Sequence, residues 1–286
     1  MLKVYDRFYI SMAHKHFVDG TGFVSLVDYM PRENLDKSIV DAARVSYDPG
    51  STKHTSTDRG LIRYLMRHWH TTPFEMVEFK FHIKMPLFVA RQHLRHRTAS
   101  VNEVSARYSE VKDEFFVPDE FRKQAQVNRQ GSEGVVRDND VSVAATKAHA
   151  EMSHQMYLEM IGKGEVCREQ ARMVLPQSMY TEFYWKINLH NLMHYLHLRM
   201  EGHAQKEIQD YAKMIYKLVK PLAPYTFEAF EDFRVNAVQL SGPETKVLSK
   251  MLENVGDIDT GDLSKGEARE FREKIHNIIN ARNTDI

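Results

Sequence analysis

The sequence predicts an α+β fold, in which a mainly antiparallel sheet is flanked by helices. Within residues 76–84, apolar and polar residues alternate from Val77 to Lys84, which is typical of a strand with one buried face. Several longer stretches have apolar residues at helical spacing. Aromatic residues become scarce beyond about residue 235, where Phe271 stands among charged helical stretches. We therefore expect a single domain over residues 1–235, followed by a charged helical C-terminal extension over residues 236–286.

The composition limits the class of protein. The chain has 286 residues, with 39 basic and 39 acidic side chains, so its formal net charge is zero. This balance, with 42% hydrophobic residues, argues against a disordered chain and a generally basic nucleic-acid binder. The single cysteine, Cys167, excludes an intrachain disulfide framework. The absence of an uninterrupted apolar leader or spanning segment predicts a cytoplasmic protein without a membrane anchor.

Strands and helices are predicted in turn along the first part of the chain. Residues 22–30 indicate a short strand, and amphipathic helices follow at 35–47 and 58–69. After the alternating strand at 76–84, Pro86 suits the start of a helix that we expect to run to residue 97. Residues 98–110 are polar and rich in serine, which predicts a loop.

The second part of the chain is predicted to be mostly helical. Residues 127–140 are polar with two glycines, which indicates a mobile surface insertion. Residues 179–187 alternate aromatic and polar side chains. The predicted helices cover residues 141–161, 166–174, 188–200, 203–220, 244–254 and 266–282.

A cluster of cationic side chains stands out at residues 91–108, RQHLRHRTASVNEVSARY. Arginine and histidine dominate its first seven residues, and serine and asparagine donors follow in the predicted loop. Because arginine binds phosphate through a planar fork of donors, this segment suits a small anion. A solvated basic face paired with acids elsewhere would explain the same composition.

The order of residues in this cluster carries more information than its charge. Arg95-His96-Arg97 and Ser105 are separated by seven residues, which resembles the signature of the flavin-dependent thymidylate synthases (ThyX family). Two further segments are similar to family motifs, namely His68 to Glu75 (H-x-H-x-T-P-F-E) and Arg172 to Pro176 (R-x-V-L-P). The other matching positions are Gln92, Asn102, Glu103, Arg107, Tyr108, Leu198, Arg199, His203, Ala204, Gln205, Glu207 and Ile208. The resemblance covers about residues 22–230 and excludes the charged extension.

The resemblance implies an enzyme that methylates dUMP to dTMP. It implies FAD as the bound cofactor, NADPH as the reductant, methylenetetrahydrofolate as the carbon donor, and a homotetramer with shared active sites. It assigns dUMP binding to Gln92, Arg95, Glu103, Ser105, Arg107, Arg172 and Arg199. It assigns FAD binding to His70, Thr72, Glu75, Arg95, His96, Arg97, Glu103, Asn188, His190 and His194. His190 and His194 depart from the arginine and asparagine of many relatives, and Met76 replaces a common histidine.

Two side chains are candidates for the chemistry. Carbon 5 of uracil needs electron density, and we expect Arg199 to favour the N3-ionised ring as an anion hole does. Ser105 has a hydroxyl, but no histidine lies at a revealing spacing, so we favour binding over covalent attack. Cys167 would be the only thiol nucleophile, and it has no neighbouring histidine to lower its pKa. A flavin-dependent route removes the need for it.

Two other functions compete with this interpretation. His190, His194, His197 and His203 have helical spacing that could place metal ligands on one face, although no HExxH glutamate accompanies them. Residues 87–97 and the following loop could also contact nucleic acid without catalysis, which the neutral overall charge disfavours. No glycine-rich Rossmann or P-loop motif occurs, so FAD would need a pocket of another kind.

Overall fold

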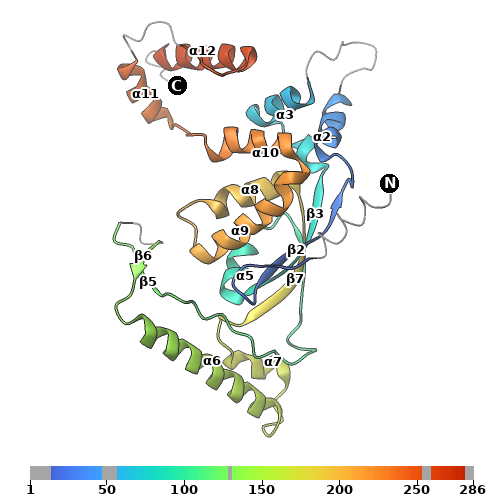
Figure 1. The fold of residues 1–286 in the computed structure, drawn as a ribbon, viewed down its shortest axis with the longest axis vertical. Coiled ribbons are helices and arrows are strands. Elements are labelled where there is room, and N and C mark those ends of the chain that lie inside the picture. Colours follow the sequence, from blue (N-terminus) through green and yellow to red (C-terminus); the bar gives the residue numbers. More distant parts are fainter. Residues whose placement is uncertain (1–13, 47–56, 128–130, 253–258, 281–286) are drawn as a thin grey trace. The chain divides into compact units, whose positions relative to one another are not determined.

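The computed structural model describes residues 14–46, 57–127, 131–252 and 259–280. Its contacts divide the chain into two units, Met1–Val235 and Asn236–Ile286. The first unit contains a five-stranded antiparallel sheet in the order β1-β2-β3-β7-β4 (Figure 1). The strands are β1 (His16–Phe17), β2 (Phe23–Met30), β3 (Glu78–Pro86), β7 (Tyr180–Asn188) and β4 (Ser100–Glu103). The predicted α+β class with a mainly antiparallel sheet is confirmed.

The central pair of strands explains the alternation in the sequence. β3 and β7 pair in one continuous register, with Phe81 opposite Trp185 and His82 opposite Tyr184. Phe81 and Trp185 are fully buried, whereas His82 and Tyr184 lie on the other, partly exposed face. Successive side chains of a strand point to opposite faces, so alternate residues of β3 and β7 supply the core. The predicted strands at 22–30 and 76–84 agree with β2 and β3.

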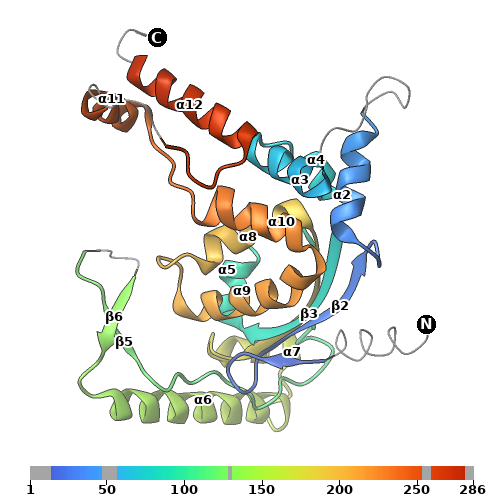
Figure 2. The same ribbon diagram turned by 45° about the horizontal axis from the view of Figure 1, so that its top comes forward.

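Helices cover the apolar face of the sheet (Figures 1 and 2). They are α2 (Leu35–Arg44), α3 (Asp58–Arg67), α5 (Leu87–His93), α8 (Leu189–Met200), α9 (Lys206–Val219) and α10 (Pro224–Phe230). Ile208, Tyr211 and Ile215 of α9 are buried at i, i+3 and i+7, the spacing of one helix face. The helices predicted at 35–47, 58–69, 188–200 and 203–220 are confirmed within the described residues, although α9 begins later than expected. The short helices α4 (Thr72–Glu75) and α10 were not predicted.

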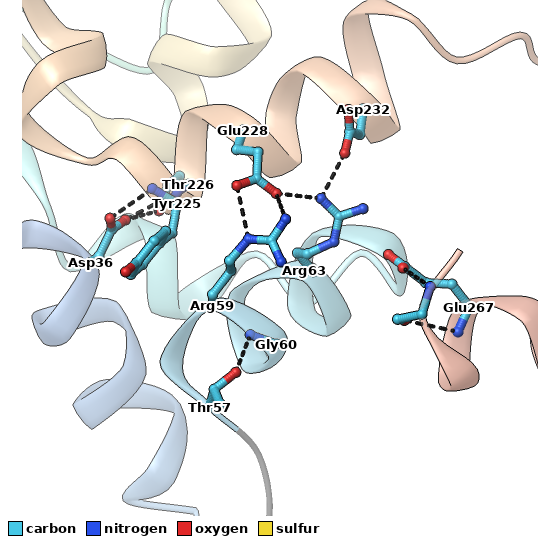
Figure 3. A network of polar contacts seen from close by, with 11 residues as sticks. Asp36, Thr57, Arg59, Gly60, Arg63, Tyr225, Thr226, Glu228, Asp232 and Glu267 are labelled. Atoms are coloured by element: carbon cyan, nitrogen blue, oxygen red, sulfur yellow. Dashed lines mark hydrogen bonds and ion pairs between the residues drawn. The ribbon is translucent and has the colours of Figure 1, made fainter. Parts of the chain in front are cut away.

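Ion pairs and hydrogen bonds join α3 to α10 (Figure 3). Arg59 donates two hydrogen bonds to Glu228, and Arg63 bonds both Glu228 and Asp232. Thr57 accepts from the backbone N–H of Gly60 and thereby caps α3. These contacts fix the end of α10, and the π-helical turn Glu231–Val235 that follows it, against α3.

A second group of elements contains α6 (Asn139–Ile161), α7 (Arg168–Ala171) and a 3₁₀ turn at Arg172–Val174 (Figure 2). The predicted long helix is confirmed, and the helix predicted at 166–174 is present as two short turns. A hairpin of β5 (Arg122–Gln124) and β6 (Ser132–Val135) precedes α6. The insertion predicted at 127–140 thus contains a strand and the start of α6, while residues 128–130 lie outside the described residues.

Two predictions around the cationic cluster are wrong. The helix expected to reach residue 97 ends at His93, where Leu94 is the C-cap. The loop expected at 98–110 contains β4, whose four residues pair with β7. Pairing with a strand distant in sequence supplies backbone hydrogen bonds that the polar sequence does not reveal, because all four β4 side chains are exposed.

The second unit contains α11 (Gly242–Met251) and α12 (Lys265–Asn280). Ser241 and Glu244 form a capping box at the start of α11. The Ser249 hydroxyl donates to the carbonyl of Ile279, which joins the ends of the two helices. Both predicted helices are confirmed over the described residues. None of the helices described here combines the length and apolar character needed to cross a membrane.

Candidate active site

Four consecutive residues after α5 line one pocket together with α8. The pocket has a volume of 290 Å³, and we call it the Arg199 pocket. Its lining residues are Arg95, His96, Arg97, Thr98, Ile187, Asn191, His194, Leu198 and Arg199. Asn191, His194 and Leu198 recur at helical i, i+3 and i+7 steps, so α8 presents one face to the pocket. Three guanidinium groups in one small cavity suit an anionic ligand.

A neutral imidazole holds Arg199. The Nε–H of Arg199 donates a hydrogen bond to Nε2 of His96 over 3.0 Å. A ring nitrogen that accepts a hydrogen bond carries no proton. Burial, followed by the charge of Arg199 and by His194, lowers the pKa of His96 to about 4. Burial and the neighbouring Arg95 lower the pKa of Arg199. His96 therefore orients the guanidinium without cancelling its charge.

A buried aromatic cluster supports this pair. His93 is fully buried, and its Nδ1 lies 3.0 Å from the hydroxyl of Tyr195. The Tyr195 ring in turn lies 4.9 Å from the His96 ring, centroid to centroid. Burial is the main cause that lowers the pKa of His93 to about 3, with His96 and Arg199 adding to it. His93 is thus a neutral part of the core beneath the Arg199 pocket.

A larger pocket of 570 Å³ lies between the loop after β4, the start of β7 and the turn after α7. We call it the Ser105 pocket, since Glu103, Ser105 and Arg172 all line it. Glu103 accepts a short hydrogen bond from Thr181. The Ser105 oxygen accepts from the backbone N–H of Arg107 over 3.2 Å. No histidine is among the described residues that line this pocket, so Ser105 has no imidazole base beside it.

A third, mainly apolar pocket of 110 Å³ is lined by Trp69 and its neighbours after α3, by one face of α8, and by Phe230 and Arg234. We call it the Trp69 pocket. Its polar lining includes His70, His190 and His194, and His194 also lines the Arg199 pocket. Burial lowers the pKa of His190, although the carboxylate of Glu75 acts in the opposite direction. Glu75 therefore lies close enough to influence this pocket.

The sequence of this chain is similar to those of known proteins. Residues 25–225 match the family described as thymidylate synthase complementing protein (Thy1). A flavin-dependent thymidylate synthase of Thermus thermophilus is 52% identical over 231 residues, covering 81% of this chain and 83% of the relative. One from Dictyostelium discoideum is 48% identical over 265 residues, covering 90% of this chain and 85% of the relative.

The chain belongs to the flavin-dependent thymidylate synthase family. Among solved structures, the UMP/dUMP methylase PolB from Streptomyces cacaoi, bound with 5-Br dUMP, is similar to it. That match has a TM-score of 0.67 and 35% identity, and covers 75% of this chain and 96% of PolB. The predicted family is therefore confirmed, and the metal hydrolase and the non-catalytic nucleic-acid binder are set aside as functions.

The structure distributes the family's signature residues over three places. Arg95, His96, Arg97, His194 and Arg199 share the Arg199 pocket, and Glu103, Ser105 and Arg172 share the Ser105 pocket. His70 and His190 lie at the Trp69 pocket with His194. The remaining predicted site residues, which line none of these three pockets, are Gln92, Thr72, Glu75, Arg107 and Asn188.

These remaining residues have identifiable local contacts. The oxygen of Gln92 is buried and has no hydrogen-bond partner within the described part of the chain. The Arg107 guanidinium lies 3.0 Å from Glu169. Asn188 caps α8 by accepting from the backbone N–H of Asn191. Thr72 and Glu75 form the short α4, which leads into β3.

The family signature did not identify every residue at these pockets. Thr98, Ile187 and Asn191 line the Arg199 pocket, and the helical spacing from His194 could have indicated Asn191. Trp69 and Arg234 line the Trp69 pocket. Nothing in the sequence connects these two residues, because they come together only through the packing of α10 on α3.

Proposed function

We propose that this chain methylates dUMP to dTMP in the Arg199 and Ser105 pockets, with FAD bound between the Arg199 and Trp69 pockets. The observation that carries this proposal is the Arg199 pocket, where Arg95 and His96 of one signature motif meet Arg199, which lies about a hundred residues later in the chain. The carbon donor is methylenetetrahydrofolate and the reductant is NADPH. A cytoplasmic location without nucleic-acid or membrane partners belongs to the same proposal.

The residues present fit FAD. This cofactor carries two phosphates and two flat ring systems, so it needs both cationic and apolar surface. The Arg199 pocket is cationic, the Trp69 pocket is mainly apolar, and His194 lines both. We assign to FAD the residues His70, Thr72, Glu75, Arg95, His96, Arg97, Glu103, Asn188, His190 and His194. When bound and reduced by NADPH, the flavin supplies hydride to the pyrimidine.

The protein's own contribution is to bind dUMP and to polarise its ring. Arg199 places positive charge beside the uracil, where it stabilises the N3-ionised form and so raises the electron density at carbon 5. His96 keeps the guanidinium oriented through its Nε hydrogen bond. The residues that we assign to dUMP binding are Gln92, Arg95, Glu103, Ser105, Arg107, Arg172 and Arg199. The unpartnered oxygen of Gln92 is consistent with this role, because a donor on the substrate would satisfy it.

The position of Cys167 does not support a mechanism in which its thiolate attacks the pyrimidine. This cysteine is exposed, and its sulfur lies 3.7 Å from the side-chain oxygen of Gln170. It lines none of the three pockets. Ser105 is better placed as a binding group than as a nucleophile, because its oxygen already accepts a backbone hydrogen bond.

Replacement of Arg199 tests the proposed mechanism. We expect Arg199→Ala to bind FAD, measured by flavin absorbance, but to form dTMP about a hundredfold to a thousandfold more slowly, the usual loss for one such donor. Arg32→Ala is a matched control, since Arg32 is exposed and pairs with Asp28 away from these pockets. Wild-type turnover in Arg199→Ala would remove this residue from the mechanism. A purified wild-type protein that takes up no flavin would refute the function itself.

We also propose that the chain acts as a homotetramer whose sites combine residues of different protomers. The Arg199 and Ser105 pockets share no lining residue, yet both contain residues that we assign to one nucleotide. In addition, α6 exposes an apolar stripe with heptad-like spacing, a surface that suits contact with another protomer. The stripe comprises Val141, Ala145, Ala148, Met152 and Met156, and its valine and two methionines are 69%, 66% and 52% exposed.

Complementation between inactive variants tests the shared sites. We expect Arg199→Ala and Arg172→Ala, when co-expressed, to regain turnover that neither has alone, because a hybrid assembly contains intact pockets from different chains. Arg199→Ala co-expressed with Arg95→Ala is the control, since both changes affect the same pocket and no protomer combination restores it. A monomer in analytical ultracentrifugation would contradict the assembly.

A further inference from the structure

One glutamate of the Ser105 pocket is held differently from the others. Four of the described residues that line this pocket are glutamates, namely Glu103, Glu110, Glu114 and Glu182. The last three each lie beside a basic side chain, namely Arg168 at 3.7 Å, Lys84 at 2.7 Å and His82 at 2.6 Å. Glu103 instead accepts a hydrogen bond from a neutral group, the hydroxyl of Thr181. This contact orients the carboxylate without cancelling its charge.

The pairing of two strands brings these two side chains together. β4 is the last strand of the sheet, and Glu103 lies opposite Phe183 of β7. Thr181 precedes Phe183 by two residues, so the side chains of Thr181 and Glu103 lie on the same face of the sheet as diagonal neighbours. A long side chain such as glutamate reaches a diagonal neighbour on the adjacent strand. The register of β4 on β7 therefore determines which hydroxyl meets Glu103.

Thr181 is the rigid member of this pair. It is 5% exposed and also lies opposite Met85 of β3, so it is held between two strands. Branching at its Cβ further restricts the side-chain torsion χ1. Glu103 is exposed at the edge of the sheet, and its longer side chain has more rotatable bonds. The hydrogen bond from Thr181 thus fixes Glu103 before a ligand arrives, which lowers the entropy lost on binding.

The chemistry of a carboxylate limits which part of dUMP it can bind. An ionised carboxylate only accepts hydrogen bonds, and its two oxygens provide about four acceptor sites. The single bond from Thr181 leaves most of these sites for a ligand. The phosphate of dUMP repels the like charge of Glu103, whereas the nucleoside part carries neutral N–H and O–H donors. A correctly oriented Glu103 therefore suits the nucleoside part.

We infer that Thr181 is a positioning residue for dUMP binding, because its hydroxyl holds the Glu103 carboxylate in the orientation that accepts from the nucleoside. The inference rests on the proposed function, which assigns Glu103 to dUMP. The positions that match the family signature do not include Thr181. Thr181 acts through Glu103, so removal of its hydroxyl weakens substrate binding without removing a group that takes part in the chemistry.

Steady-state kinetics of the FAD-loaded enzyme, with dUMP varied at saturating NADPH and methylenetetrahydrofolate, test this inference. Thr181→Val keeps the branched shape and removes the hydroxyl. We expect it to raise the KM for dUMP about tenfold and to change kcat little, since one hydrogen bond to a charged group is lost from binding. Thr181→Ser retains the hydroxyl and should have nearly the wild-type KM. Valine suits a strand and water can replace the bond to the exposed Glu103, so the Tm of Thr181→Val should not fall.

Two comparisons separate positioning from packing. In a Glu103→Ala background, Thr181→Val should not raise the Kd for dUMP further, measured by calorimetry, because the hydroxyl has lost its acceptor. Tyr216→Phe is the matched control, since it removes a hydroxyl that donates to a glutamate, Glu231, outside the three pockets. A wild-type KM in Thr181→Val, or equal losses in Thr181→Val and Thr181→Ser, would overturn the inference. Absence of flavin uptake or of dTMP formation in the wild type would instead refute the proposed function.

Discussion

Acid should destabilise this protein through His93. Burial holds the pKa of His93 at about 3, whereas an unfolded histidine titrates at about 6.5. Between these values the unfolded chain binds more protons than the folded chain, so the free energy of unfolding rises with pH. The stabilisation is fully present above pH 6.5 and is lost as the pH falls toward 3. At pH 4.5 the loss from this residue is about 3 kcal/mol, because the pH lies about two units below the unfolded pKa and each unit is worth about 1.4 kcal/mol.

Urea unfolding at pH 7 and pH 4.5, at one protein concentration, measures this effect. His93→Phe keeps a ring in the core but cannot titrate, so its loss of stability between the two pH values should be about 2–3 kcal/mol smaller. The hydroxyl of Tyr195 loses its partner in this variant, but that cost applies at both pH values and cancels in the comparison. His149→Phe is the control, since His149 is exposed on α6. Equal loss of stability between the two pH values in the wild type and in His93→Phe would show that burial of His93 does not cause the acid sensitivity.

Two further predictions concern other parts of the fold. Cys167→Ser should retain wild-type dTMP formation, because the exposed Cys167 lines none of the three pockets. A large loss of turnover in a steady-state assay would indicate instead that Cys167 acts as a nucleophile. Gly22→Ala should lower the free energy of unfolding by about 1–3 kcal/mol, because a Cβ there would meet the Tyr211 hydroxyl at 1.8 Å. Denaturation of Gly22→Ala with and without Tyr211→Phe would check that cause, since removing the hydroxyl should recover part of the loss.

The sequence predicted those elements whose burial leaves a periodic pattern. β3 alternates because one face is fully buried, and α9 repeats its apolar residues because one side covers the sheet. β4 leaves no such pattern, since Ser100–Glu103 are exposed and their conformation depends on pairing with β7. A helix end that is set by a distant strand cannot be located from local propensity.

The site was predicted to a similar extent. The ordered motifs indicated Arg95, His96 and Arg199, which the structure brings into one pocket. They gave no indication that Arg234 lies over Trp69, because each residue taken alone resembles an ordinary surface side chain. The contact depends on the ion pairs that fix α10 to α3, and no spacing in the sequence encodes a contact between elements so far apart along the chain.

The wrong prediction of a helix to residue 97 explains how the Arg199 pocket arises. Consecutive residues of an α-helix point about 100° apart, since there are 3.6 residues per turn, so four in a row cannot face one cavity. Arg95 to Thr98 do line one cavity together. They can do so because the chain leaves the helix at Leu94 and turns to pair Ser100–Glu103 with β7. The pairing of β4 with β7, which the sequence did not predict, therefore also brings the cationic side chains close to Arg199. The site requires that the regular helix end before these residues.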